Sequence, residues 1–141
     1  MKVIFLDYDG VLNNWGTTTK TIDGILTMAD KQLVARLNLI IERTGAKLVL
    51  SSSWRLFPDW ERAMELSGIK EKFLGRTGKD HDLRGEEIDA WLNDHPEVTK
   101  YAIIDDCNDM LPSQLPNFFQ TSSEFGLTQE IADSVKKHLQ S

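Results

Sequence analysis

The stretch VIFLDYDGVLNN, residues 3–14, contains the feature on which the fold assignment depends. Four apolar residues run directly into Asp7, and Asp9 and Gly10 follow closely. A continuous apolar run is typical of a strand buried on both faces, and two carboxylates at its end are costly to desolvate unless a ligand binds there. Gly10 allows a tight turn where a Cβ would obstruct the backbone. The stretch predicts either an aspartate turn or a site where one carboxylate binds a cation and attacks an electrophile while the other handles a proton.

Four further segments of the chain have the character of short strands. The runs KLVL (47–50) and YAII (101–104) are continuously apolar, as expected for strands of a parallel sheet covered on both faces. FFQT (118–121) is a predicted edge strand, and KFLGRT (72–77) is a weaker candidate.

Helical periodicity separates these strands. The first predicted helix begins at a candidate capping box formed by Thr27 and Asp30 and ends at Gly45. Thr128 is the expected N-cap of the last helix. The alternation predicts a doubly wound, three-layer α/β/α sandwich with a mostly parallel central sheet, in which ligands bind at the carboxyl ends of the strands. The other predicted helices cover residues 58–67, 85–93 and 127–139.

Composition limits the possible classes of protein. With 141 residues, 40% of them hydrophobic and 27% charged, the chain is expected to form one domain, residues 1–141. The net charge of −6 argues against a generic nucleic-acid binder but leaves room for a local positive pocket. Because Cys107 is the only cysteine and no membrane span or signal peptide is evident, a cytoplasmic location is expected. Nothing in the sequence indicates an obligate protein partner.

The segment VLSSSWR (49–55) follows the second predicted strand. Ser51, Ser52 and Ser53 offer hydroxyl and backbone N–H groups at a helix entrance, which is a natural anion site. Arg55 adds a forked, permanently charged donor that suits phosphate. Taken alone, the segment could equally be a serine-rich turn with a surface arginine.

Two more charged groups lie near predicted strand ends. Arg84 stands just before a helix, where a cation opposes the helix dipole, which suggests that it neutralises an anion elsewhere. Asp105 and Asp106 leave the strand of IIDDCNDM (103–110), with Asp109 nearby. Crowded acids repel one another unless a cation neutralises them, and oxygen-only ligands favour Mg²⁺ over zinc.

Taken together, the four segments resemble the motifs of the haloacid dehalogenase (HAD) superfamily of aspartate-nucleophile phosphatases. DYDGVL is similar to the first motif, the serine run to the second, Arg84 to the third and DDCND to the fourth. The resemblance is greatest to small capless HAD domains associated with nucleic-acid repair. It spans nearly the whole chain and implies a HAD-like, Rossmann-type fold.

The resemblance also implies a role for each matching residue. Asp7 would be the nucleophile that forms an aspartyl-phosphate, and Asp9 the acid that protonates the leaving oxygen and then activates water. Ser52, with Ser51 as the rival, would bind phosphate together with Ser53, Arg55 and the turn at Gly10, and Arg84 would replace the more usual lysine. The expected ligands of Mg²⁺ are the Asp7 carboxylate, the Asp9 carbonyl and one of the Asp105/Asp106 pair, with Asp106 preferred and Asp105 or Asp109 behind it.

The lengths of the connecting segments carry information about the substrate. Neither the segment after Gly10 nor the one between Arg55 and Arg84 is long enough for a folded cap, so an open site is expected. An open site favours an extended substrate, such as a nucleic-acid terminus or a phosphoprotein, and nucleotides are a further candidate. NNWGTTTKT (13–21) is either a flap, with Trp15 stacking on a base and Lys20 meeting phosphate, or a plain polar loop. The alternatives to a phosphomonoesterase are a phosphotransferase or mutase of the same fold and a non-catalytic phosphate- or metal-binding module.

Overall fold

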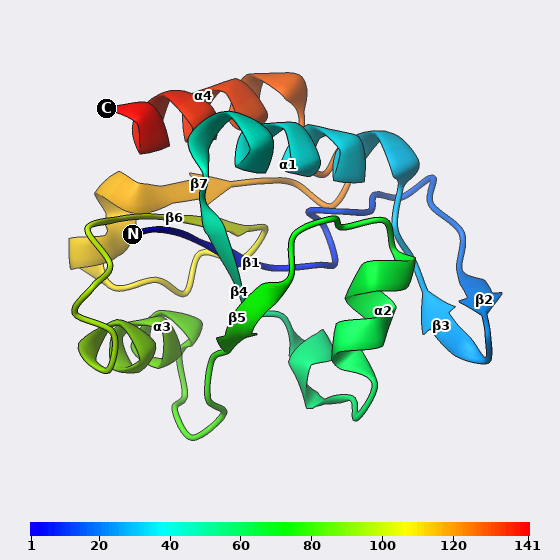
Figure 1. The fold of residues 1–141 in the computed structure, drawn as a ribbon, viewed down its shortest axis with the longest axis horizontal. Helices are drawn as coiled ribbons and strands as arrows, with labels where there is room; N and C mark the ends of the chain where they lie inside the picture. Colours follow the sequence, from blue (N-terminus) through cyan, green and yellow to red (C-terminus); the bar gives the residue numbers. More distant parts are fainter.

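A computed structural model describes residues 1–141. Its centre is a five-stranded sheet in the order β5-β4-β1-β6-β7, in which every neighbouring pair is parallel (Figure 1). All five predicted strands are therefore present, and β1 lies in the middle of the sheet. The strands are β1 (Lys2–Leu6), β4 (Lys47–Leu50), β5 (Phe73–Arg76), β6 (Lys100–Asp105) and β7 (Phe118–Gln120).

Helices cover both faces of this sheet, which confirms the predicted three-layer architecture. Helices α1 (Lys31–Thr44) and α4 (Gln129–Gln140) lie together on one face, and α3 (Arg84–Asn93) lies on the other (Figure 1). Helix α2 (Trp60–Leu66) follows the short 3-10 helix η1 (Ser53–Leu56), and a second 3-10 helix, η2 (Pro112–Asn117), precedes β7. None of the helices combines the length and the apolar character needed to cross a bilayer.

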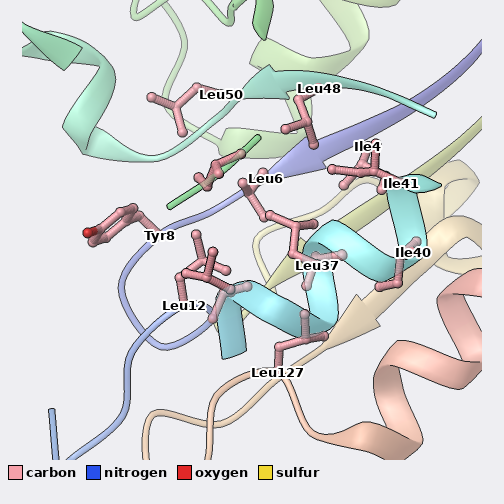
Figure 2. Packing of buried hydrophobic residues seen from close by; sticks show 14 of the residues in the cluster. Ile4, Leu6, Tyr8, Leu12, Leu37, Ile40, Ile41, Leu48, Leu50 and Leu127 are labelled. Atoms are coloured by element: carbon pink, nitrogen blue, oxygen red, sulfur yellow. The ribbon is translucent and has the colours of Figure 1, made fainter. Parts of the chain in front are cut away.

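The core is divided by the sheet into two apolar clusters. Leu6 and Leu48 face the α1 side of the sheet, where they belong to one cluster with Leu37 and Leu127 (Figure 2). Because side chains alternate along a strand, the neighbours of these residues face α3 instead. Phe5 therefore faces α3. Asp7, the residue after Leu6, faces α3 as well. The cluster on the α3 side contains Val3, Phe5, Val49, Ile88, Ile103 and Met110.

A two-stranded hairpin between β1 and α1 was not expected from the sequence. It comprises β2 (Lys20–Ile22) and β3 (Ile25–Thr27), and it lies beside α2 at the edge of the molecule (Figure 1). Asp23 and Gly24 form its turn with φ values of 52° and 77°, the backbone that an Asp-Gly hairpin requires. The Asp23-Gly24 dipeptide is the feature of the sequence that could have predicted the hairpin. The hairpin is the only folded insertion between β1 and α1, so the chain has no cap domain, as predicted.

The structure corrects one helix start and confirms two other predicted helix ends. Asp30, rather than Thr27, is the N-cap of α1, because its carboxylate accepts the N–H groups of Gln32 and Leu33. Thr27 is the last residue of β3, so the predicted capping box does not form. Gly45 ends α1 in the left-handed conformation, and Thr128 caps α4 as predicted.

Candidate active site

Asp7, Ser51 and Asp105 lie side by side at the carboxyl ends of three adjacent strands. The parallel register continues one residue beyond the strands, because Ser51 N–H donates to Leu6 O and Asp7 N–H donates to Ile104 O, both at 3.0 Å. All three residues are buried, and the alternation of side chains turns them toward the α3 face. Segments far apart in the sequence thus place two carboxylates and a hydroxyl in one row.

Arg84 reaches this row from the first residue of α3. Its Nη1 lies 2.7 Å from Asp105 Oδ2 and 3.2 Å from Asp7 Oδ1. Asp109 holds the start of the helix in place, because its Oδ2 accepts the N–H of Arg84 at 3.1 Å and its carbonyl accepts the N–H of Gly85. The arrangement bears out the expectation that Arg84 neutralises an anion away from its own helix.

The electrostatics of the row are those of an under-neutralised acid cluster. Burial, followed by repulsion from Asp105, raises the pKa of Asp7 to about 9, although Arg84 opposes the change. Burial also raises the pKa of Asp105, again against the effect of Arg84. For Arg84, burial works against the charge, but Asp105 and Asp7 outweigh it and raise the pKa. One arginine therefore does not compensate both carboxylates.

Asp106 occupies a different position from Asp105. Its carboxylate lies directly against Cα of Gly10, where any Cβ would collide with it, and it accepts a hydrogen bond from Ser123 Oγ at 3.0 Å. Gly10 also has a φ of 76°, a conformation that side chains rarely adopt. The sequence favoured Asp106 as the acid that holds Mg²⁺ together with Asp7. The register brings Asp105 into the row, where it pairs with Arg84. Asp106 lies half-exposed at the edge of the row, close enough to Asp7 to help raise the pKa of that carboxyl.

The three serines have different environments. Ser51 Oγ is fully buried without a hydrogen-bond partner, next to Asp7 in the row. Ser52 Oγ accepts the N–H of Trp54 at 3.2 Å and so caps η1, and Ser53 is exposed. The sequence favoured Ser52 as the phosphate-binding hydroxyl, whereas the register favours Ser51.

Comparison with known proteins agrees with this geometry. Residues 3–132 match the model of a family described as the HAD domain in Swiss Army Knife RNA repair proteins. The chain belongs to this HAD family. A solved structure assigned to the HAD superfamily (subfamily III A) hydrolases, from Legionella pneumophila, shares the fold, with a TM-score of 0.51 and 14% identity over 99% of this chain and 83% of the other. No curated protein matches the chain.

Arg55 is one residue of this HAD domain that the structure does not bring to the site as predicted. It is buried, and its Nη2 donates to both carboxylate oxygens of Glu87 at 3.0 and 3.1 Å. Its other N–H groups donate to backbone carbonyls in the loops after β4 and β5, including those of Ser52 and Thr77. Since its donors are all engaged within the protein, Arg55 fixes these loops and does not face a phosphate.

Asp9 stands exposed at the mouth of the site with its carboxylate held from two sides. Trp54 Nε1 donates to Asp9 Oδ2 at 3.0 Å, and Asn13 Nδ2 donates to Oδ1 at 2.9 Å. Sequence reasoning missed both partners, because the local pattern around Trp54 and Asn13 does not show that their side chains meet Asp9. It also missed Thr77, whose buried hydroxyl has no partner and lies next to Ser51 in the continued register of β5.

The donor set of the site fits a divalent, oxygen-preferring cation. Asp7 and Asp105, whose pKa values are both raised, lie side by side in the row, and a cation would relieve their repulsion. Cys107 Sγ lies within 4.8 Å of carboxylate oxygens of Asp105 and Asp106, but burial and Asp106 raise the pKa of this thiol to about 11. A neutral thiol is a poor ligand for Mg²⁺, which leaves the oxygen atoms as the expected ligands.

Proposed function

We propose that this HAD domain, residues 1–141, is a Mg²⁺-dependent phosphomonoesterase of the cytoplasm that works through an aspartyl-phosphate on Asp7. The observation that supports this most strongly is the placement of Asp7 between Ser51 and Asp105, with Arg84 Nη1 3.2 Å from its carboxylate. Phosphoryl transfer needs mainly positioning and charge neutralisation, and this row of residues can supply both.

Different residues of the site would bind Mg²⁺ and the phosphoryl group. The carboxylates of Asp7, Asp105 and Asp106 with the backbone carbonyl of Asp9 would hold Mg²⁺, which would supply positive charge against the phosphate oxygens. Ser51 would donate its unpartnered hydroxyl to the phosphoryl group, with Ser52 as the alternative. Arg84 would keep Asp7 and the phosphate from repelling each other.

The reaction would proceed in two steps, formation and then hydrolysis of the aspartyl-phosphate. In the first, a carboxylate oxygen of Asp7 forms a bond to phosphorus, the bond to the leaving oxygen breaks, and Asp9 gives its proton to that oxygen. In the second, Asp9 takes a proton from water as the water oxygen bonds to phosphorus. The bond from Asp7 to phosphorus breaks, and inorganic phosphate leaves.

We further propose that the substrate is a phosphorylated nucleic-acid end, with nucleotides as a second candidate. No cap encloses the site, and exposed aromatic side chains follow the carboxyl ends of three strands. Trp15 after β1 is 76% exposed, Phe57 after β4 is 54% exposed and Phe125 after β7 is 58% exposed. Bases can stack on such side chains. Lys20, exposed at the start of the hairpin, can meet backbone phosphate. The description of the family as a domain of RNA repair proteins agrees with this choice.

A phosphatase panel tests both parts of the proposal. It compares oligonucleotides phosphorylated at the 3′ or 5′ end with mononucleotides, sugar phosphates and phosphopeptides, with and without Mg²⁺, at low and moderate salt. We expect the highest kcat/KM on an oligonucleotide end, reduced in Trp15→Ala. Because the chain is acidic overall, polymer binding should be weak, and salt should weaken it further by screening the contact of Lys20 with phosphate.

Three outcomes would contradict parts of this proposal. Equal efficiency on mononucleotides without an effect of Trp15→Ala would remove the polymer substrate. Phosphate recovered on an added alcohol instead of in water would indicate a phosphotransferase. Binding of phosphate or metal without turnover of any substrate would indicate a non-catalytic module.

A further inference from the structure

We propose that Trp54 and Asn13 are positioning residues that hold the Asp9 carboxylate in the orientation needed for proton transfer to the leaving group. This inference rests on the proposed function, since it assigns Asp9 the role of acid and base. It adds two residues from different parts of the chain to the site. Trp54 is a buried residue of η1, and Asn13 lies in the turn after β1.

Each of the two donors binds a different oxygen of the Asp9 carboxylate. Trp54 Nε1 donates to Oδ2 at 3.0 Å, and Asn13 Nδ2 donates to Oδ1 at 2.9 Å. Hydrogen bonds to a charged acceptor are stronger than those between neutral groups. Each carboxylate oxygen keeps further acceptor capacity, so the exposed side of Asp9 can still carry a proton to a substrate oxygen or take one from water.

Trp54 is itself held rigidly. Its indole is only 7% exposed, and its ring packs on Tyr8 at a centroid distance of 4.2 Å and against the edge of Phe57 at 5.7 Å. Its backbone N–H donates to Ser52 Oγ at 3.2 Å. An indole fixed in this way directs its N–H at one point, so the orientation of Asp9 is set by the packing of the core.

Asn13 is fixed by a complementary set of partners. Its Oδ1 accepts the N–H of Gly10 at 2.8 Å, and its Nδ2 donates to Met28 O at 2.9 Å as well as to Asp9. An N–H can only donate and a carbonyl can only accept, so the orientation of the amide is determined. Asn13 therefore links Asp9 to the turn at Gly10 and to the end of the hairpin.

The absence of a cap makes this support important for the reaction. An exposed aspartate without fixed partners would rotate among several rotamers, and proton transfer requires one donor at hydrogen-bond distance from the leaving oxygen. In a site without a closing domain, the partners that restrict Asp9 come from the body of the fold. Trp54 and Asn13 thus form a clamp on the Asp9 carboxylate. Its effect should appear with substrates whose leaving group needs a proton.

Leaving-group dependence separates this role from a structural one. Trp54→Phe keeps an aromatic ring against Tyr8 but removes the N–H donor. The value of kcat/KM reports the steps up to departure of the leaving group. We expect it to fall about 10- to 100-fold on an alkyl phosphomonoester such as a nucleoside monophosphate, because the alkoxide needs a proton. On p-nitrophenyl phosphate, whose phenolate leaves unaided, we expect little change.

The chain offers a matched control. Trp60 is also 7% exposed, packs against Phe73 and contributes to the same core, but its indole makes no hydrogen bond to Asp9. Trp60→Phe should leave the ratio of the two kcat/KM values at the wild-type level. Asn13→Ser, which shortens the other donor, should change the ratio in the same direction as Trp54→Phe.

A spectroscopic measurement tests the clamp without relying on turnover. The four tryptophans give four indole N–H resonances, and Trp54→Phe identifies the one from Trp54. In Asp9→Ala this resonance should shift and exchange faster with solvent. An unmoved resonance, or equal losses on both substrates in Trp54→Phe, would overturn the clamp. A wild-type protein that hydrolyses neither substrate while the resonance responds to Asp9→Ala would overturn the proposed function instead.

Discussion

Arg55 and Glu87 form a buried, forked ion pair in which one guanidinium nitrogen lies 3.0 and 3.1 Å from the two carboxylate oxygens. Through this pair the loop after β4 is tied to α3, the helix that carries Arg84 at its first residue. The pair therefore connects the serine segment with the cation that faces Asp7.

Breaking this pair should be strongly destabilising. We expect Glu87→Ala to lower the free energy of unfolding by about 3–5 kcal/mol, because it leaves the charge of Arg55 buried without its partner. Chemical denaturation measures the change. Asp89→Ala is the control, since Asp89 is exposed on the same helix and should change stability by about 0.5 kcal/mol or less. Similar losses in both variants would contradict the assigned role of the pair.

Asp7→Asn should abolish turnover and change how stability depends on pH. The folded protein retains the proton of Asp7 up to about pH 9, because its pKa is raised from 3.8, whereas the unfolded chain releases it near 3.8. Between these values the folded state binds more protons, so metal-free stability falls as pH rises through this window. Asp7→Asn should flatten this decline and raise stability at pH 8 by about 1–3 kcal/mol. Melting curves of metal-free protein from pH 5 to 9 test this, and a wild-type rate in folded Asp7→Asn would refute the nucleophile.

Mg²⁺ should stabilise the wild-type protein by relieving the repulsion within the acid cluster. Free Mg²⁺ at a hundred times its Kd adds about 2.7 kcal/mol to the free energy of unfolding. Asp105→Asn, which removes one negative charge from the proposed Mg²⁺ site, should reduce the resulting rise in Tm. Ca²⁺ should also raise Tm but support less turnover, since its coordination is looser. A Tm indifferent to millimolar Mg²⁺ would count heavily against a metal site.

Ser51 and Ser52 should respond differently to removal of the hydroxyl. A hydrogen bond to a charged group contributes about 1.5–3 kcal/mol, so Ser51→Ala should lower kcat/KM about 10- to 100-fold. Its stability should change little, because Ser51 Oγ has no partner to lose. Ser52→Ala should mainly destabilise, by about 0.5–2 kcal/mol, through loss of the cap of η1. The opposite pattern in paired kinetic and denaturation measurements would restore the original preference for Ser52.

Gly10 should tolerate a side chain much less well than another glycine with the same backbone conformation. Gly10→Ala adds a collision with the Asp106 carboxylate to the strain of its φ of 76°. Gly24 has a φ of 77° with no atom within 4 Å of the added Cβ, so Gly24→Ala measures the backbone strain alone, about 1 kcal/mol. We expect Gly10→Ala to lose more stability than this and to weaken stabilisation by Mg²⁺. Equal losses would mean that the contact with Asp106 has no energetic consequence.

The five strands of the central sheet, most of the helix ends and the acids at the ends of β1 and β6 could be predicted from the sequence alone. These features depend on local causes: continuous apolar runs, helical periodicity and capping residues close in sequence. The hairpin was missed because its strands are short and largely exposed, so that only the Asp-Gly turn marked it.

Which of two neighbouring polar residues occupies a given position in the site depends on the tertiary structure. Ser51 and Asp105 flank Asp7 because parallel strands distant in sequence pair in a particular register, and a shift of one residue would turn Ser52 and Asp106 to that face instead. Arg55 faces inward because Glu87 and the carbonyls of two loops meet there. Such positions depend on contacts between distant segments, which the local pattern around each residue does not contain.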